Sequence, residues 1–279
     1  DGTYEAEVLI DHDTMGTKDV RVHVACTIEG DQLTVDLTGT DDRPELVGVW
    51  NTFANSRSYI MTQVVAAMDP AIVKNEGFFQ AVDMFIPEGS IAQPPANKPA
   101  ALGSFHPACE ITEAVCLALS QVASQPQLYK IGMPNAVIGF DQKGRMWMDQ
   151  GVDSRTMDAS AVQGIDGWGS CPVSLGNLLL AQVEDAESRV SVINISREMT
   201  TDSEGAGRWR GQPGSLNVKK VLEPTTAMAW MVSAAHPLSG LCGGDDASPS
   251  ASRCEGGTPT EYAVLLSANA RSPAGSVIA

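Results

Sequence analysis

The residues best suited to chemistry are four histidines and a glycine-rich loop that carries two arginines. His106 stands in the stretch Gly-Ser-Phe-His-Pro, directly before a predicted helix. A helix N-terminus can hold an anion or a neutral imidazole poised for proton transfer. His106 is therefore the strongest catalytic candidate, although the spacing alone does not require a catalytic role. His236 precedes a proline and is predicted to lie in a loop, while His23 falls on the polar side of an alternating strand pattern.

Two carboxylates follow His106 in the first turns of the same predicted helix. Glu110 and Glu113 could each serve as a general base. The positive end of the helix dipole also favours acidic residues there, which is a sufficient structural reason for both. Both interpretations stay open at the level of sequence.

The densest motif is the loop at residues 202–214, which holds four glycines and two arginines. Backbone N–H groups at Gly205 and Gly207, with the guanidinium groups of Arg208 and Arg210, are candidates for binding an anion. The alternative is a glycine turn in which the arginines pair with acidic residues and Trp209 packs. Strand-like residues follow the loop, so a dinucleotide fingerprint or a P-loop is rejected.

His12 lies between two aspartates, and imidazole with carboxylates suits several divalent metals. Neighbouring residues of a strand point to opposite faces, so only Asp11 and Asp13 would share a side. A polar strand end is the simpler interpretation, and no metal site is assigned from the sequence. Ser104 and Ser170 lack the spacing of a nucleophile elbow.

Six cysteines are scattered along the chain without a Cys-x-x-Cys pair. A chain of this size does not need disulfides to hold its fold, so free, buried thiols in a reducing cytoplasm are predicted. They stand at positions 26, 109, 116, 171, 242 and 254.

The elements that must position these residues are mostly strands. Alternation predicts strands over residues 5–10, 20–25 and 33–37, with a tight turn at Gly30, as a three-stranded antiparallel meander. Helical spacing predicts helices over residues 51–68, 107–122 and 175–186, the first capped by Thr52 or Asn55. Further strands are expected over residues 84–86, 136–140, 145–149, 190–195, 217–222 and 227–234, the last two as a pair, with a loop over 240–260. The fold class expected is α+β: β-rich, mostly antiparallel sheet with a few packed helices, and no clear boundary within residues 1–279.

The composition of the chain restricts the classes of binding partner that are expected. The chain has 18 Lys+Arg and 34 Asp+Glu, a net charge of −16, which argues against nucleic acid and anionic membrane surfaces. No apolar run approaches the roughly 20 residues of a transmembrane helix. We expect a cytoplasmic protein. Both ends of the sequence read as cuts within a longer polypeptide, so we also expect an apolar face covered by a partner.

Five stretches in order resemble the hydantoinase B/5-oxoprolinase family, which includes the large subunit of acetone and acetophenone carboxylases. They are Asp-Gly-Thr-Tyr-Glu-Ala-Glu at the start, Leu-Thr-Val-Asp-Leu-Thr-Gly-Thr at 33–40, Asn-Glu-Gly-Phe-Phe at 75–79, Ile-Pro-Glu-Gly-Ser at 86–90 and the loop at 202–214. Each motif alone is weak, but their order and spacing extend along nearly the whole chain.

The resemblance implies a hetero-oligomeric enzyme. ATP would be bound by a hydantoinase A-like partner subunit and used to phosphorylate the oxygen of a cyclic amide or an enolised ketone. The family's divalent-metal ligands belong to segments that precede the Asp-Gly-Thr-Tyr-Glu motif, so no metal ligand is carried over to this chain. The remaining hydantoinase B-like segments are expected as further partners.

The reaction stays open between three hypotheses. The sequence after Gly167 departs from the hydantoinase pattern, which favours an ATP-dependent ketone carboxylase. The alternatives are an ATP-dependent cyclic-amide hydrolase and a non-catalytic structural subunit of such a complex. Should the resemblance mislead, an acidic small-molecule binding module with an anion site at Arg208 and Arg210 is the remaining hypothesis.

Overall fold

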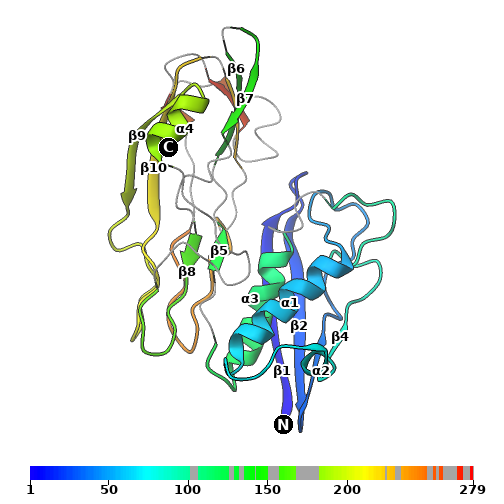
Figure 1. Cartoon of the computed structure of the whole chain (residues 1–279). Coiled ribbons are helices and arrows are strands. Elements are labelled where there is room, and N and C mark those ends of the chain that lie inside the picture. The colour runs from blue at the N-terminus through cyan, green and yellow to red at the C-terminus, as the bar shows by residue number, and fades with distance from the viewer. Residues whose placement is uncertain are drawn as a thin grey trace.

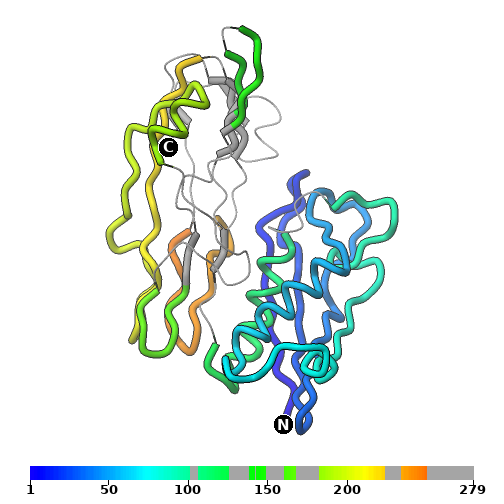
Figure 2. Tube along the Cα trace, in the orientation of Figure 1, coloured from blue at the N-terminus to red at the C-terminus, as the bar shows by residue number. Residues whose placement is uncertain are grey.

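The chain folds into two lobes, which Figure 1 shows side by side. The computed structural model describes residues 1–100, 106–125, 129–131, 135–141, 143–149, 157–167, 182–223, 225–229, 234–249, 254–255, 258–259, 269–272 and 277–278. The first lobe runs from the N-terminus to the end of helix α3, and the second holds the later strands (Figure 2). The absence of an internal domain boundary stays a prediction.

The first lobe is built on a twisted sheet in the order β1-β2-β3-β4. Its strands are β1 (Gly2–His12), β2 (Lys18–Glu29), β3 (Gln32–Asp36) and β4 (Val82–Phe85). The first three form the predicted antiparallel meander, and β4 adds to β3 in parallel. Gly30 has φ +62° in the hairpin between β2 and β3, a left-handed conformation that glycine adopts without steric cost. The expected meander is therefore confirmed.

Three helices complete this lobe: α1 (Phe53–Ala67), α2 (Glu76–Phe79) and α3 (Ala108–Ser120). Thr52 caps α1 by accepting a hydrogen bond from the backbone N–H of Asn55, as predicted. Buried apolar side chains of α1 and α3 join one core with the inner face of the sheet. Burial of this apolar area is what fixes α3 against β1 and β2.

The second lobe is built from short antiparallel strands. A five-stranded sheet has the order β13-β14-β11-β6-β7, a four-stranded sheet the order β12-β15-β10-β9, and β5 pairs with β8. Their bounds are β5 (Tyr129–Ile131), β6 (Asn135–Phe140), β7 (Met146–Asp149), β8 (Met157–Ala159), β9 (Val192–Met199), β10 (Ser215–Val221), β11 (Thr225–Ala229), β12 (Cys254–Glu255), β13 (Thr258–Pro259), β14 (Asn269–Ser272) and β15 (Val277–Ile278). The α+β, mostly antiparallel class is confirmed.

In this lobe, some helix bounds and strand pairings differ from those predicted from the sequence. Helix α4 covers Val183–Arg189, and residues 175–181 of the predicted helix lie outside the described residues. The strands predicted over 217–222 and 227–234 form as β10 and β11 but belong to different sheets. The adjacency in sequence suggested a hairpin, but β10 pairs with β9 and β11 pairs with β6 and β14. Among the described residues no helix is long and apolar enough to cross a membrane.

Candidate functional site

Helix α3 presents a buried histidine–carboxylate pair at its N-terminus. The Nδ1 atom of His106 lies 3.0 Å from Oε1 of Glu110, one helical turn away. The Glu110 side chain is fully buried and that of His106 is 11% exposed. Opposite an ionised carboxylate, which accepts hydrogen bonds but donates none, a neutral imidazole carries its proton on Nδ1 and leaves Nε2 as the proton acceptor. This arrangement suits a general base.

Glu113 ties α3 to a segment that is distant in sequence. Its Oε1 accepts hydrogen bonds from the backbone N–H of Ser239 at 3.0 Å and from the Ser239 hydroxyl at 2.8 Å. Glu113 is 1% exposed, so these bonds form in a medium of low dielectric. Nothing in the local sequence predicts this contact, because the two residues are 126 positions apart.

Asp11 anchors the same distant segment from strand β1. Its two carboxylate oxygens accept the backbone N–H groups of Ala234 at 2.7 Å and His236 at 2.8 Å. The Nε2 atom of His236 lies 2.8 Å from Oδ1 of Asp19. The first lobe thus holds residues 234–239 through three acidic side chains: Asp11, Asp19 and Glu113.

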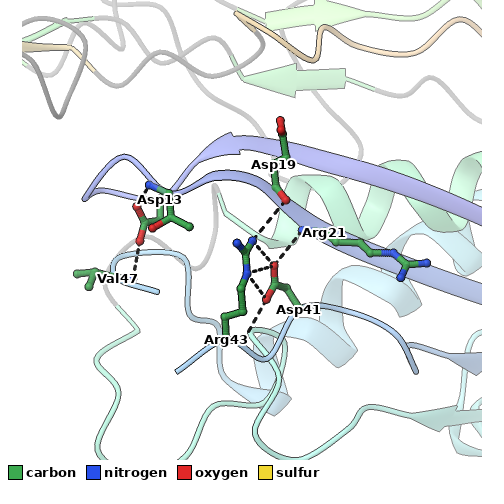
Figure 3. Close-up of polar contacts among 7 residues, drawn as sticks. Asp13, Asp19, Arg21, Asp41, Arg43 and Val47 are labelled. Atoms are coloured by element: carbon green, nitrogen blue, oxygen red, sulfur yellow. Dashed lines mark hydrogen bonds and ion pairs between the residues drawn. The ribbon is translucent and has the colours of Figure 1, made fainter. Parts of the chain in front are cut away.

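Asp13 is a structural carboxylate that caps a loop. Oδ1 accepts the N–H groups of Met15 and Thr17, each at 2.8 Å. Oδ2 accepts the N–H group of Val47 at 3.0 Å (Figure 3). His12 places Nδ1 2.8 Å from the Asp13 carbonyl oxygen. The acidic pair around His12 therefore serves the backbone, in line with the polar strand-end interpretation.

A groove of about 480 Å³ opens at the end of the first sheet, beside an ion pair between Asp41 and Arg43. The Arg43 side chain contacts both oxygens of Asp41 at 2.5–3.0 Å (Figure 3). Burial alone would raise the pKa of Asp41, but hydrogen bonds and charge from Arg43 outweigh it and lower this pKa. The hydrogen bond to Asp41 raises the pKa of Arg43 in turn. Each charge is neutralised by the other, so Arg43 offers the groove no uncompensated positive charge.

The glycine-rich loop at 202–214 packs against residues 240–246. A Cβ atom at Gly205 would collide with the carbonyl oxygen of Asp245, and one at Gly207 would lie 3.0 Å from the Trp209 carbonyl oxygen. Glycine is needed at Gly205 because two backbones meet there. Asp245 donates its N–H to the Ala206 carbonyl at 2.8 Å, which closes the contact.

The two arginines of this loop have protein partners. Arg210 contacts Glu204 at 3.1 Å and Asp166 at 3.7 Å. The Arg208 guanidinium lies 4.8 Å from the centre of the Trp209 ring. These contacts agree with the structural interpretation of the motif, and the anion-binding role of Gly205, Gly207, Arg208 and Arg210 stays a prediction.

The buried cysteines Cys26 and Cys116 are poor candidates for thiol chemistry. Cys26, Cys109, Cys116 and Cys242 are free thiols, and the first three are buried. Burial raises the pKa of Cys26 to about 12, and burial, Glu113 and Cys242 raise that of Cys116 to about 12. Thiols with such pKa values are unreactive at neutral pH. The prediction of free, buried thiols is confirmed for Cys26, Cys109 and Cys116, whereas Cys242 is free but exposed.

A divalent metal, as the family resemblance implies, has no ligand set within the described residues. No group of three or more His, Cys, Asp or Glu side chains there could hold a metal ion. Both oxygens of Asp13 and both oxygens of Asp11 already accept backbone N–H groups. Ser104 and Ser170 lie outside the described residues, as does the stretch at 168–177.

The site therefore combines an imidazole oriented by a buried carboxylate with a segment held in place by further acids. This is an acid–base constellation on an α+β scaffold. Residues 1–276 match the sequence profile of hydantoinase B/oxoprolinase. The chain belongs to the hydantoinase B/oxoprolinase family.

Individual relatives agree with this assignment. The chain is 26% identical over 231 residues to a protein of a Pseudomonas species that is assigned as the B component of a D-/L-hydantoinase, covering 77% of this chain and 38% of that protein. It is 23% identical over 251 residues to the beta chain of the caprolactamase of Pseudomonas jessenii, covering 87% and 43%.

Solved structures show the same fold. The ATP-dependent caprolactamase of Pseudomonas jessenii superposes with a TM-score of 0.79 at 20% identity, covering 100% of this chain and 50% of that one. Nucleotide-free acetone carboxylase gives 0.75 at 16% identity, covering 99% and 44%. The chain thus spans half or less of the length of these proteins.

Proposed function

We propose that this chain is part of a subunit of an ATP-dependent complex that opens small cyclic amides by hydrolysis. The observation that carries the proposal is that two sequence relatives, spanning 77% and 87% of the chain, are components of a hydantoinase and a caprolactamase. Hydantoin and caprolactam are both cyclic amides. ATP is expected on a hydantoinase A-like partner subunit, and the remaining hydantoinase B-like segments would complete the site. The location proposed is the cytoplasm.

The role proposed for this chain is proton transfer by His106. Glu110 accepts the Nδ1–H hydrogen bond at 3.0 Å and fixes the imidazole, so that Nε2 can take a proton from an attacking water. Phosphorylation of the amide oxygen by ATP makes the ring carbon a stronger electrophile, and this step belongs to the partner. Glu110 acts through the histidine and is a positioning residue.

The experiment uses the complete polypeptide purified with its hydantoinase A-like partner. ATP turnover is measured with hydantoin, 5-oxoproline and caprolactam, and separately with acetone or acetophenone plus bicarbonate. Stimulation by a cyclic amide, with release of the ring-opened amino acid, supports the proposal. A complex that is intact by mass and turns over no cyclic amide refutes it.

Two variants test the site. His106→Asn should lower substrate-stimulated turnover by about 10²–10⁴-fold, the range for loss of a general base. Glu110→Gln should lower it less and should shift the pH profile of turnover, because an amide orients the imidazole without stabilising its protonated form. His23→Asn is the matched control, since the Nδ1 atom of His23 bonds to the Thr38 carbonyl in the first sheet, away from helix α3. Unchanged turnover in His106→Asn would exclude His106 and favour the structural-subunit hypothesis.

A ketone carboxylase is the second candidate. It is favoured by the sequence after Gly167, which departs from the hydantoinase pattern. Formation of a carboxylated product from acetone or acetophenone with bicarbonate, in the same assay, would establish it over the hydrolase.

A further inference from the structure

A small cavity lies where the glycine-rich loop meets the segment that Asp11 and Glu113 anchor. Its volume is about 50 Å³, room for a single small ion or a water molecule. Three parts of the chain line it: residues 160–161, residues 205–212 and residues 238–247. Ser239, which bonds to Glu113, is part of the wall, so the cavity is connected to helix α3.

Gln212 in this wall is a buried polar side chain whose oxygen has no partner. The residue is 5% exposed, and its Oε1 atom makes no hydrogen bond within the described part of the chain. Buried amide oxygens are nearly always satisfied, and an unsatisfied one is costly. An unpaired buried acceptor on a residue that lines a cavity points to a ligand that donates hydrogen bonds or carries positive charge.

Glu204, on the opposite arm of the loop, also has a buried oxygen without a hydrogen-bond partner among the described residues. Gly211 donates its N–H to the Gly205 carbonyl at 3.0 Å, and Glu204 and Gln212 flank this bond. The Glu204 side chain is 9% exposed; Arg210 contacts its Oε1, whereas Oε2 is buried without a hydrogen-bond partner among the described residues. Gln212 is thus the residue of the cavity wall with an unpaired buried acceptor, and Glu204 adds a second one in the loop directly before the wall residue Gly205.

We propose that this cavity binds a small monovalent cation, such as K⁺, Na⁺ or ammonium, through oxygen atoms. Amide, hydroxyl and carbonyl oxygens with few carboxylates are the ligands of hard cations. A divalent ion normally recruits several carboxylates, whereas Asp245 is the only acidic residue within the described part of the wall. The bound ion would fasten the glycine-rich loop to the anchored segment. The site does not depend on the reaction proposed above.

The test is thermal unfolding of the complete protein at constant ionic strength in chloride salts. KCl, NaCl and NH₄Cl are compared with tetramethylammonium chloride, which is too large for the cavity, and with MgCl₂ and CaCl₂. A saturable rise of Tm with at least one small monovalent ion, and none with tetramethylammonium, is expected. Equal Tm in all monovalent salts would overturn the proposal, as would stabilisation by the divalent ions alone.

Two variants at the site separate a cation from a trapped water. Gln212→Leu should abolish the ion-dependent rise of Tm, and Gln80→Leu, at an exposed glutamine of the first lobe, should keep it. Should Gln212→Leu fail to fold, Gln212→Glu adds a second carboxylate and should increase the ion-dependent rise. A Gln212→Glu protein that is destabilised equally in all salts would indicate a water site and overturn the assignment.

Discussion

At the scale of single residues, buried carboxylates are used here as acceptors for backbone donors. Asp11, Asp13 and Glu113 are at most 7% exposed, and each accepts at least one backbone N–H group. Hydrogen bonds to an ionised acceptor are stronger than those between neutral groups, and they offset the cost of burying the charge. Each of these acids therefore fixes a piece of loop that has no regular structure of its own.

Asp13 provides a direct test, since three backbone N–H groups converge on it. Asp13→Asn keeps the shape but replaces one acceptor by an NH₂ group facing a donor. We expect a loss of about 1–3 kcal/mol in the free energy of unfolding, measured by urea titration. Asp31→Asn, in an exposed hairpin, should change it little. Equal stability of the two variants would contradict the role assigned to Asp13.

Asp41 should make stability depend on acid pH. Its folded-state pKa is lowered by Arg43, so its contribution is present above the unfolded-state pKa of about 3.9 and is lost as the pH falls through the lower folded-state value. The Asp41→Asn variant should therefore have a lower Tm than the unmodified protein at pH 7. This difference in Tm should be smaller at pH 3. A Tm difference that stays constant from pH 7 to pH 3 would show that the ion pair adds nothing.

At the scale of elements, caps and apolar faces define the helices. Helix α1 begins at Phe53, directly after its N-cap Thr52, whose hydroxyl accepts the Asn55 N–H at 3.3 Å. The helix buries Tyr59, Ile60 and Val64. Helix α3 has no side-chain cap, and nearly all of its residues are buried. Local capping thus contributes to α1, whereas packing against β1 and β2 holds α3.

The cap of α1 can be tested by itself. Thr52→Ala should cost about 1 kcal/mol of unfolding free energy, and Thr52→Ser should restore most of it, because serine retains the hydroxyl. Chemical denaturation of the unmodified protein and of the two variants measures both changes in the free energy of unfolding. A serine variant as unstable as the alanine variant would mean that the threonine methyl group, and not the cap, is responsible.

At the scale of the whole molecule, the segment at 234–239 joins the two lobes through side chains of the first. Asp11 holds the N–H groups of Ala234 and His236, and Glu113 holds Ser239. These contacts connect residues that are 126 to 225 positions apart in sequence. The segment also forms one wall of the proposed cation site, through Leu238 and Ser239.

Hydrogen–deuterium exchange can measure this connection. Asp11→Asn should speed exchange of the amides of Ala234 and His236 by about tenfold or more, while exchange within β2 stays unchanged. The reason is that loss of the charged acceptor weakens both bonds, each worth roughly 1.5–3 kcal/mol. Protection at 234–236 equal to that of the unmodified protein would show that the segment is held by other contacts.

Local patterns predicted much of the first lobe. Alternation of apolar residues over 5–10, 20–25 and 33–37 specified the meander, and Thr52 marked the start of α1, because side-chain period and capping act over a few residues. Strand pairing in the second lobe was not predictable in this way. Residues 215–221 and 225–229 are adjacent in sequence but separate into two sheets, since their partners come from other parts of the chain.

Residue order alone was enough to predict the α+β class, the family, and a helix that follows His106 with acidic residues in its first turns. The acids that accept backbone N–H groups, the contact of Glu113 with Ser239, and the cavity with Gln212 in its wall became apparent only in the folded chain. The difference lies in the sequence separation over which each interaction acts. Periodicity, caps and turns depend on neighbours within a few residues, whereas these contacts form only when burial of the apolar core brings distant segments together.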